Sequence, residues 1–412
     1  MESPDILLRV GGTLPRKDLA CARSVCSKWR DSMALPPPYH EILATVRDLF
    51  GGLTAWSSDG ELVAALFDSH VHVYNTTTGA LAYRVKMLFR EQHFSDPEED
   101  DDDERPFPDV VAMSFRPADP RSSMDLVVLS IPPTARLAPR LLTFAPDGTE
   151  RSSTPLIADG IEGMPPTMRV HSAYFARDAA TLAVLYETPE NDLMELQLSV
   201  LDFDRSADHR LLRIRTLDIA VGWNENVALS PDGSKVATLT VTEADHMAER
   251  VATTHVIVHD GVVARTLYEN VGVAPGCGNA AWDASSRLLS FVEFQEKRVF
   301  VCDVVRGGIR CISLSSPPHE CAWSLDRLVI CHDADDRVGI NGDVMEVPLR
   351  VVDSKTGHTV QSVSFHSLTP HLHGCRLNTL VVSPDGRAVL GFVYAFVHPP
   401  DDRRFALRLI NL

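Results

Sequence analysis

The sequence predicts a mainly β protein preceded by a short helical segment. Three observations carry this prediction. Apolar side chains recur at helical spacing near the N-terminus, three consecutive prolines then interrupt any helix, and short alternating apolar runs follow between clusters of Gly, Pro, Asp, Asn and Ser. The chain is therefore expected to contain a helical segment at 1–34, a Pro-rich linker at 35–39 and a β domain at 40–412.

The helical segment opens with the residues that favour a helix start. Ser3 can cap a first helix, Pro4 suits its first position, and Asp5 is favoured near its positive end. Further along, apolar side chains at spacings of three and four line one face, namely Leu19, Ala22, Val25, Cys26 and Trp29. A stretch of about 35 residues cannot bury enough surface to be stable alone, so this face predicts a partner.

The β domain repeats one unit, seen most clearly between Leu53 and Leu81. A strand ending at Trp56 leads through a Ser-Ser-Asp-Gly turn into a second strand, and a third strand ends in Asn-Thr-Thr-Thr-Gly. The same order returns around the Ser-Pro-Asp-Gly turns at 230–233 and 383–386. Asp-Gly suits a tight hairpin turn, because Gly accepts positive φ and Asp bonds back to the backbone. The Ala-Pro-Asp-Gly at 145–148 follows a strand that resembles the third strand of a unit. It is therefore not expected to be the turn between the first and second strands of a unit.

One position can be taken as equivalent in each of seven units: Trp56, Phe115, Phe175, Leu229, Trp282, Trp323 and Val382. These positions lie 41 to 60 residues apart, so several units must carry loops longer than a compact four-stranded blade needs. The acidic segment 95–105 repels itself and predicts a disordered insertion.

Radial packing into a closed ring is the simplest arrangement for regular four-stranded units. The expected architecture is therefore a divergent seven-bladed β-propeller. Closure of the ring requires the two ends of the β domain to pair, and this can be tested. The last unit ends at Leu412 after only three strands, so residues 40–46 are expected to supply the missing outer strand and to close the ring.

Charge and hydropathy exclude some classes of function. A formal net charge of −17 argues against nucleic-acid binding, which depends on Lys and Arg. No stretch approaches the ~18 consecutive apolar residues of a transmembrane helix, and the acidic N-terminus does not resemble a signal peptide. The expected location is therefore the cytoplasm, the nucleus or both, with no membrane partner.

The chemical motifs point away from catalysis and metal binding. The eight cysteines contain no C-x-x-C pair, so most are expected to be buried, reduced thiols. His366, His371, His373 and Cys375 are dense enough to suggest a metal loop, but their spacing fits no closed structural site. Neither a G-x-S-x-G nucleophile elbow nor a phosphate-binding G-x-x-x-x-G-K-[ST] occurs. We expect no cofactor, no metal and no enzymatic activity.

The β domain resembles WD-repeat and related propellers over roughly residues 39–412. The resemblance rests on the Ser-Pro-Asp-Gly turns and on third strands that end in Asp or Asn followed by Thr-Gly or Gly, at 73–79, 301–307 and 351–357. It departs from that family because no third strand ends in Trp-Asp. The only Trp-Asp, at 282–283, is assigned to a different strand.

The N-terminal segment resembles an F-box. The matching residues are those at 5–10 (Asp-Ile-Leu-Leu-Arg-Val), 14–19 (Leu-Pro-Arg-Lys-Asp-Leu) and 25–30 (Val-Cys-Ser-Lys-Trp-Arg). The family's usual leading Leu-Pro is absent or shifted by one residue, and two glycines, at 11–12, stand where its first helix normally continues. The resemblance implies binding to a Skp-type adaptor through Ile6, Leu7, Leu8, Leu14, Pro15, Leu19, Val25, Cys26, Trp29 and Arg30.

An F-box followed by a propeller is the order found in substrate receptors of cullin–RING ubiquitin ligases. The resemblance therefore implies a Skp–cullin–F-box type receptor in which the propeller holds an unknown protein substrate. Three alternatives stay open at this point. Residues 1–34 could be a helical hairpin packed on the propeller, the chain could be an interaction scaffold without a ligase, or the propeller could be a hydrolase or lyase with a scattered site.

Overall fold

The computed structural model describes the chain in eighteen ranges: residues 43–46, 53–67, 70–87, 110–117, 124–131, 139–156, 169–190, 193–204, 211–217, 219, 223–244, 251–261, 263–273, 277–293, 296–332, 346–366, 373–397 and 402–412. The N-terminal segment 1–34, the linker 35–39 and the acidic insertion 95–105 lie outside these ranges. Within the ranges every regular element is a β-strand, which confirms the prediction of a mainly β fold. The same residues include no helix that could cross a lipid bilayer.

The strands form seven four-stranded antiparallel sheets. Sheets 1 to 3, each from its inner to its outer strand, are sheet 1 (β2 Thr54–Trp56, β3 Leu62–Phe67, β4 His70–Asn75, β5 Leu81–Lys86), sheet 2 (β6 Val110–Pro117, β7 Met124–Ser130, β8 Arg140–Phe144, β9 Glu150–Pro155) and sheet 3 (β10 Arg169–Phe175, β11 Thr181–Glu190, β12 Leu193–Phe203, β13 Leu211–Leu217).

Sheets 4 to 7, in the same order, are sheet 4 (β14 Trp223–Leu229, β15 Lys235–Ala244, β16 Val251–Asp260, β17 Val263–Val273), sheet 5 (β18 Cys277–Trp282, β19 Leu288–Glu293, β20 Arg298–Asp303, β21 Gly308–Ser313), sheet 6 (β22 Pro318–Ser324, β23 Arg327–His332, β24 Glu346–Asp353, β25 Thr359–His366) and sheet 7 (β26 His373–Val382, β27 Ala388–Val397, β28 Asp402–Asn411, β1 Leu43–Val46).

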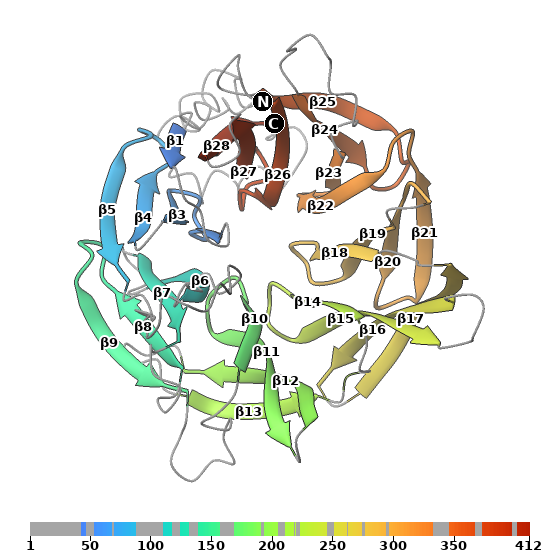
Figure 1. Cartoon of the computed structure of the whole chain (residues 1–412), viewed down its shortest axis with the longest axis horizontal. Coiled ribbons are helices and arrows are strands. Elements are labelled where there is room, and N and C mark those ends of the chain that lie inside the picture. Colours follow the sequence, from blue (N-terminus) through green and yellow to red (C-terminus); the bar gives the residue numbers. More distant parts are fainter. Residues whose placement is uncertain are drawn as a thin grey trace, which may run out of the picture.

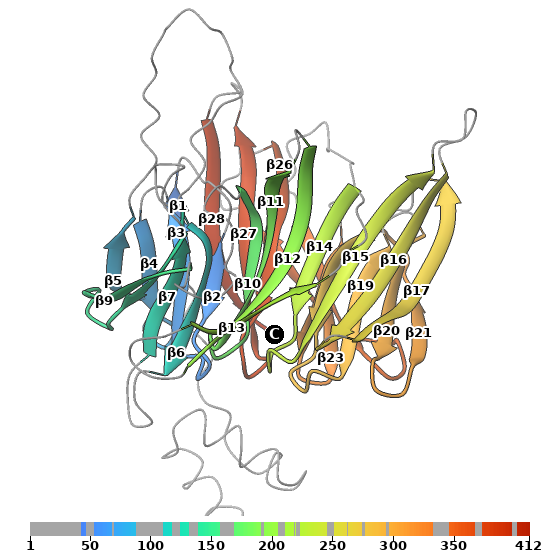
Figure 2. The same cartoon turned by 90° about the horizontal axis from the view of Figure 1, so that it is seen from below.

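The sheets stand side by side in a ring, as Figure 1 shows from above and Figure 2 from the side. The first strand of each sheet lies nearest the axis and the fourth lies at the rim. This arrangement of small antiparallel sheets is consistent with propeller-like blades. All seven positions predicted to be equivalent, from Trp56 to Val382, lie on these innermost strands.

The ring closes where the sequence predicts. β1 pairs antiparallel with β28, with Leu43 opposite Arg408 and Val46 opposite Phe405, and so becomes the outermost strand of sheet 7. The predicted closing strand is thereby confirmed. Because β1 comes from the N-terminal side of the domain and β26–β28 from its C-terminus, this pairing joins the two ends of the β domain.

The Ser-Pro-Asp-Gly segments form the tight turns between first and second strands. In sheet 4, the Ser230 hydroxyl donates to the Asp232 carboxylate at 2.7 Å and accepts from the Lys235 N–H at 2.9 Å. Gly233 closes the turn with its N–H on the Ser230 carbonyl and has a φ of +71°, which only glycine adopts without strain. The turns at 57–60 and 383–386 repeat these bonds.

The Ala-Pro-Asp-Gly segment at 145–148 connects β8 to β9, the third and fourth strands of sheet 2, so its exclusion as a first turn is confirmed. The predicted third-strand endings are also confirmed. Asn75, Asp303 and Asp353 end β4, β20 and β24, and the side chain of each accepts backbone N–H groups of the turn that follows.

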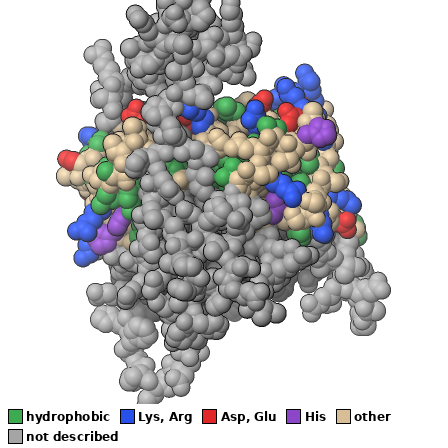
Figure 3. Space-filling view, turned by 90° about the horizontal axis from the view of Figure 1, so that it is seen from above, with side chains coloured by type: hydrophobic (Ala, Val, Ile, Leu, Met, Phe, Trp, Pro, Cys, Tyr) green, Lys and Arg blue, Asp and Glu red, His purple; other side chains and the backbone are tan. Residues whose placement is uncertain are grey.

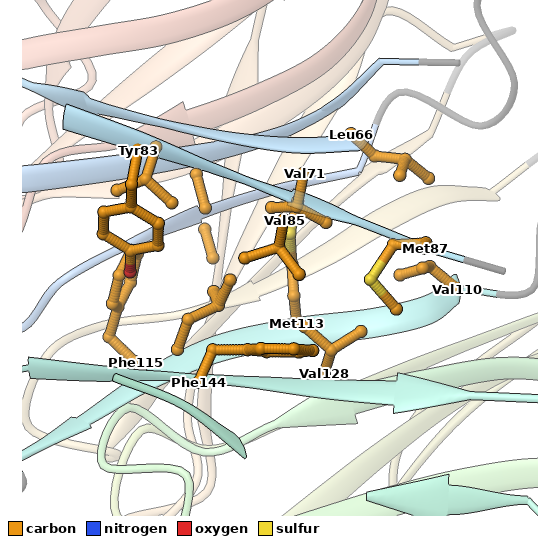
Figure 4. Close-up of a cluster of buried hydrophobic side chains, with 14 residues drawn as sticks. Leu66, Val71, Tyr83, Val85, Met87, Val110, Met113, Phe115, Val128 and Phe144 are labelled. Atoms are coloured by element: carbon orange, nitrogen blue, oxygen red, sulfur yellow. The ribbon is translucent and has the colours of Figure 1, made fainter. Parts of the chain in front are cut away.

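A separate apolar core fills each interface between neighbouring sheets. Figure 4 shows the one between sheets 1 and 2, where Leu66, Val85, Phe115 and Phe144 pack together. Corresponding clusters join sheets 2 and 3, 3 and 4, 4 and 5, 5 and 6, and 6 and 7. A seventh cluster joins sheet 7 to sheet 1 around Trp56 and Leu390, so burial of apolar side chains is continuous around the ring.

The two ends of the ring differ in their connections. The first and third strands of each sheet run toward one end of the ring, here called the turn end, where the described tight turns lie. The second and fourth strands run toward the opposite end, here called the loop end. The register of β1 with β28 shows that the chain enters β1 from the turn end. Figure 3 shows the ring from one side, where basic, His and hydrophobic side chains are interspersed over the described surface.

Candidate functional site: the inner wall of the ring

The candidate site is formed by the innermost strands, which surround the axis of the ring (Figure 1). Six of these strands, β6, β10, β14, β18, β22 and β26, shift register against their neighbours near the loop end. Such bulges redirect side chains and are over-represented beside functional sites. The surface they shape is called the inner wall below.

Three polar side chains on the inner wall form a chain of hydrogen bonds from sheet to sheet. The Asn226 side chain on β14 donates from Nδ2 to Asn279 Oδ1 on β18 at 2.7 Å. Asn279 Nδ2 in turn donates to Glu320 Oε1 on β22, also at 2.7 Å. The Glu320 carboxylate further accepts the backbone N–H of Leu380 on β26. Four consecutive sheets are thus connected through these groups.

Glu320 is the electrostatically unusual member of this chain. Its side chain is buried, with 7% of its surface exposed, whereas Asn279 is exposed and Asn226 partly so. Burial raises the pKa of Glu320 to about 7, although the hydrogen bonds from Asn279 and Leu380 oppose the shift. No described Lys, Arg or His forms an ion pair with it.

Two larger side chains of sheet 3 lie further toward the turn end. Tyr174 on β10 keeps 38% of its surface exposed, yet the surrounding protein raises its pKa. Arg177, in the turn after β10, is also exposed, yet desolvation lowers its pKa. A side chain near the axis of a ring is expected to contact water while protein atoms crowd it from several sides. Tyr174 and Arg177 show this combination.

Arg177 links turns that are distant in sequence. Its guanidinium donates to the carbonyl of Ser58 in sheet 1 at 3.2 Å, and its backbone N–H donates to the carbonyl of Pro231 in sheet 4 at 3.1 Å. Asp385 in sheet 7 is close enough to favour its charged form. A positive charge therefore lies at the turn end of the ring, among turns of sheets 1, 4 and 7.

Tryptophan side chains join some inner strands by a second type of hydrogen bond. Trp282 Nε1 donates to the Ala228 carbonyl at 2.9 Å, and Trp323 Nε1 donates to the Ala281 carbonyl at 3.0 Å. Trp56 Nε1 reaches the Val381 carbonyl of sheet 7 at 3.4 Å. In each case the indole satisfies an inner-strand carbonyl of the preceding sheet.

The residues predicted to bind an adaptor, from Ile6 to Arg30, all lie outside the described residues, so their prediction stays open. His366 and His373 lie at the end of β25 and the start of β26, and Cys375 lies on β26. Their side chains, like His371, are also outside the description. No group of three potential metal ligands occurs among the residues that are described.

The prediction of buried, reduced cysteines is confirmed for Cys302, Cys321 and Cys331, each at most 2% exposed and in the thiol form. Burial raises the pKa of the Cys302 and Cys321 thiols to about 12, so both stay protonated and unreactive. Cys311 differs because it is exposed on the rim strand β21.

Sequence reasoning missed Asn226, Asn279 and Glu320, although a signal was present. Each stands three residues before an equivalent position: Leu229, Trp282 and Trp323, respectively. The corresponding residues in sheets 1 and 2 are Leu53 and Ala112. A comparison of the units at this position alone would have shown a change from apolar to polar side chains around the ring.

The sequence matches no protein-family model and no curated protein. Within the described part of the chain, the inner wall offers amide groups and one buried carboxyl, and no His or second acid is hydrogen-bonded to Glu320. These groups suit the binding of a polar or cationic ligand, whereas a hydrolytic site would need a nucleophile or an acid–base pair.

Proposed function

We propose that the chain is the substrate-recognition subunit of a Skp–cullin–F-box type ubiquitin ligase, with residues 1–34 as F-box and the ring as a divergent seven-bladed β-propeller. The observation that carries the proposal is the position of β1. This strand is separated from the F-box-like segment by eight residues, closes the ring as the outer strand of sheet 7, and is entered from the turn end. On this proposal the target binds at the inner wall near the loop end, opposite the end from which the chain enters β1.

Such a receptor works by proximity and performs no chemistry itself. The eight residues between 34 and 43 can span no more than about 30 Å, so an adaptor bound to the F-box stays close to the ring. Holding the target on the same chain raises the effective concentration of its lysines near the ubiquitin-charged enzyme.

The alternative is an interaction scaffold with the same ring but no ligase. Both functions use the inner wall, so only adaptor binding separates them. The test is co-purification of the full chain with a Skp-type adaptor, beside a Leu7→Asp, Trp29→Ala double variant. The matched control is Val263→Asp, which places an acid on an exposed apolar site of the rim strand β17.

Stoichiometric adaptor binding by the wild type and by the control, with loss in the double variant, is the expected result. A folded wild-type chain that does not retain the adaptor would overturn the receptor function and leave the scaffold in its place. Folding of each variant is checked by its thermal unfolding transition.

A further inference from the structure

Glu320 is a buried acid whose charge has no cationic partner among the described residues. Asp125 shows how the same fold treats another buried acid. Its carboxylate, 2% exposed, lies 3.6 Å from Arg116 and 3.1 Å from Arg151. Glu320 instead has two neutral donors, the Asn279 amide and the Leu380 N–H. Since a buried carboxylate is costly without a counter-charge, the arrangement leaves a cationic group to be supplied from outside.

The position of Glu320 makes an external cation possible. The carboxylate accepts a 2.7 Å hydrogen bond from Asn279, whose own side chain is exposed, so only this one side chain links it to the exposed surface of β18. Asn226 and Asn279 each use part of their hydrogen-bonding capacity on one another, and each amide retains acceptor or donor sites. A cation at the wall would therefore meet amide oxygens first and the carboxylate immediately beyond them.

The approach to this site is from the loop end. Asn226, Asn279 and Glu320 lie on the loop-end part of their strands, beside the bulges. The turn end carries the positive charge of Arg177, which repels a second cation. The net charge of −17 attracts basic partners over longer distances.

We propose that the inner wall of sheets 4 to 6 binds one Lys or Arg side chain presented by a segment of a partner protein, with Glu320 as the counter-charge and Asn226 and Asn279 as polar contacts. A single carboxylate with amide oxygens suits a monovalent organic cation. The proposal names the class of target segment, so its biological meaning rests on the receptor function proposed above.

The test uses the full chain and acetylated, amidated pentapeptides Gly-Ser-X-Ser-Gly, in which X is Arg, Lys or citrulline. Citrulline keeps the shape of Arg and removes its charge. Ligand-observed NMR titration measures each affinity. We expect the Arg and Lys peptides to bind at least about tenfold more tightly than the citrulline peptide.

Two buried glutamates provide a matched pair of variants. Glu320→Gln keeps the shape at the inner wall and removes the charge, so it should weaken Arg-peptide binding at least about tenfold. Glu293→Gln is the control, because Glu293 is 1% exposed and also accepts from an asparagine, Asn270 Nδ2 at 2.9 Å. Its asparagine lies on the rim strand β17, away from the inner wall. The control should bind within about twofold of the wild type.

Asn279→Leu is the second test variant, since its exposed site tolerates substitution even if Glu320→Gln fails to fold. It removes a polar contact and should weaken Arg-peptide binding several-fold. Equal affinities for the Arg and citrulline peptides would overturn the proposal. So would equal losses in Glu320→Gln and Glu293→Gln, or no binding up to about 10 mM peptide. The peptide titration contains no adaptor, so its failure is distinguishable from failure of the receptor function.

Discussion

Sheets 1 and 2 have apolar residues on, or directly before, their inner strands at the positions where sheets 4 to 6 have polar ones. Leu53 and Ala112 belong to the first group. Asn226, Asn279 and Glu320 belong to the second, and hydrogen bonds join them from sheet to sheet. The sheet 1–sheet 2 interface holds a cluster of fourteen buried apolar residues around Phe115, and the interfaces of sheets 4 to 6 have apolar cores as well, so the two regions differ in the polar row that sheets 4 to 6 add.

The difference separates two physical roles within one repeated architecture. Apolar contacts are non-directional and stabilise the ring in proportion to the area they bury. Hydrogen bonds between buried polar groups contribute less net stability and require exact geometry. A row of polar groups that ends in a carboxyl without a cationic partner among the described residues contributes little net stability, as the recognition proposed above requires.

The largest effect is expected from Phe115→Ala in the apolar part of the ring. Phe115 is fully buried between sheets 1 and 2 (Figure 4), so the substitution removes its contacts and leaves a cavity. The free energy of unfolding should fall by about 3–5 kcal/mol. Chemical denaturation followed by tryptophan fluorescence measures it.

The matched substitution in the polar part is Asn226→Ala, which removes one exposed hydrogen bond. It should lower the free energy of unfolding by only about 0.5–1.5 kcal/mol. Comparable losses from the two substitutions would contradict the division into stabilising and recognising parts.

A somewhat smaller effect is expected from the titration of Glu320. Burial raises its pKa from 4.5 to about 7, so the folded chain retains a proton that the unfolded chain releases. Glu320 therefore lowers stability as the pH rises from about 4.5 to about 7, by up to about 3 kcal/mol. The neighbouring thiol of Cys321, with a pKa of about 12, stays neutral in this range.

Glu320→Gln mimics the protonated side chain and should abolish this loss. The variant should match the wild type near pH 4.5 and exceed its free energy of unfolding above pH 7. Asp232 and Asp303, with pKa values of about 2, stabilise the fold in the opposite direction, but they lose that contribution only below about pH 4. Parallel pH profiles for wild type and variant would show that Glu320 titrates normally.

Much of the architecture could be predicted because local chemistry determines it. The Ser-Pro-Asp-Gly turns fix the hairpins through bonds among neighbouring residues, such as those of Ser230 and Asp232. The closing strand could be predicted for a different reason. A last unit with only three strands leaves an unpaired edge, and β1 covers it by pairing with β28.

The polar residues of the inner wall leave a signal in the sequence, but their hydrogen bonds could not be predicted because these bonds join residues far apart in the chain. Asn279 and Glu320 are 41 residues apart, and their bond exists only because closure places β18 beside β22. The arginine at position 177 is a stronger case, since its bond to the Ser58 carbonyl spans 119 residues. Nothing in the local sequence of either residue indicates the other.

A further prediction concerns the interface between sheets 3 and 4, where the apolar and polar parts meet. Gly233 has a φ of +71°, and an added Cβ would lie 2.5 Å from Thr181 Oγ1 in sheet 3. Gly233→Ala should therefore cost about 2 kcal/mol or more, from backbone strain and steric overlap together.

Gly261→Ala is the control for backbone strain alone. Gly261 has a similar φ of +65°, but nothing lies within 4 Å of an added Cβ. This substitution should cost about 1 kcal/mol. If the denaturation midpoints fall equally in the two variants, the close contact between Gly233 and Thr181 adds nothing to the loss of unfolding free energy.

The smallest expected effect is the difference between Trp282→Phe and Trp56→Phe. Both substitutions remove an indole N–H that bonds a carbonyl of the preceding sheet, but the Trp282 bond to Ala228 is 2.9 Å long and the Trp56 bond to Val381 is 3.4 Å. Since hydrogen bonds weaken with length, Trp282→Phe should lower the free energy of unfolding by about 1 kcal/mol more. Equal losses in chemical denaturation would mean that the indole rings stabilise the ring through burial alone. The side-chain hydrogen bonds that stabilise the contacts between inner strands would then be those that start at Asn226, without those of the tryptophans.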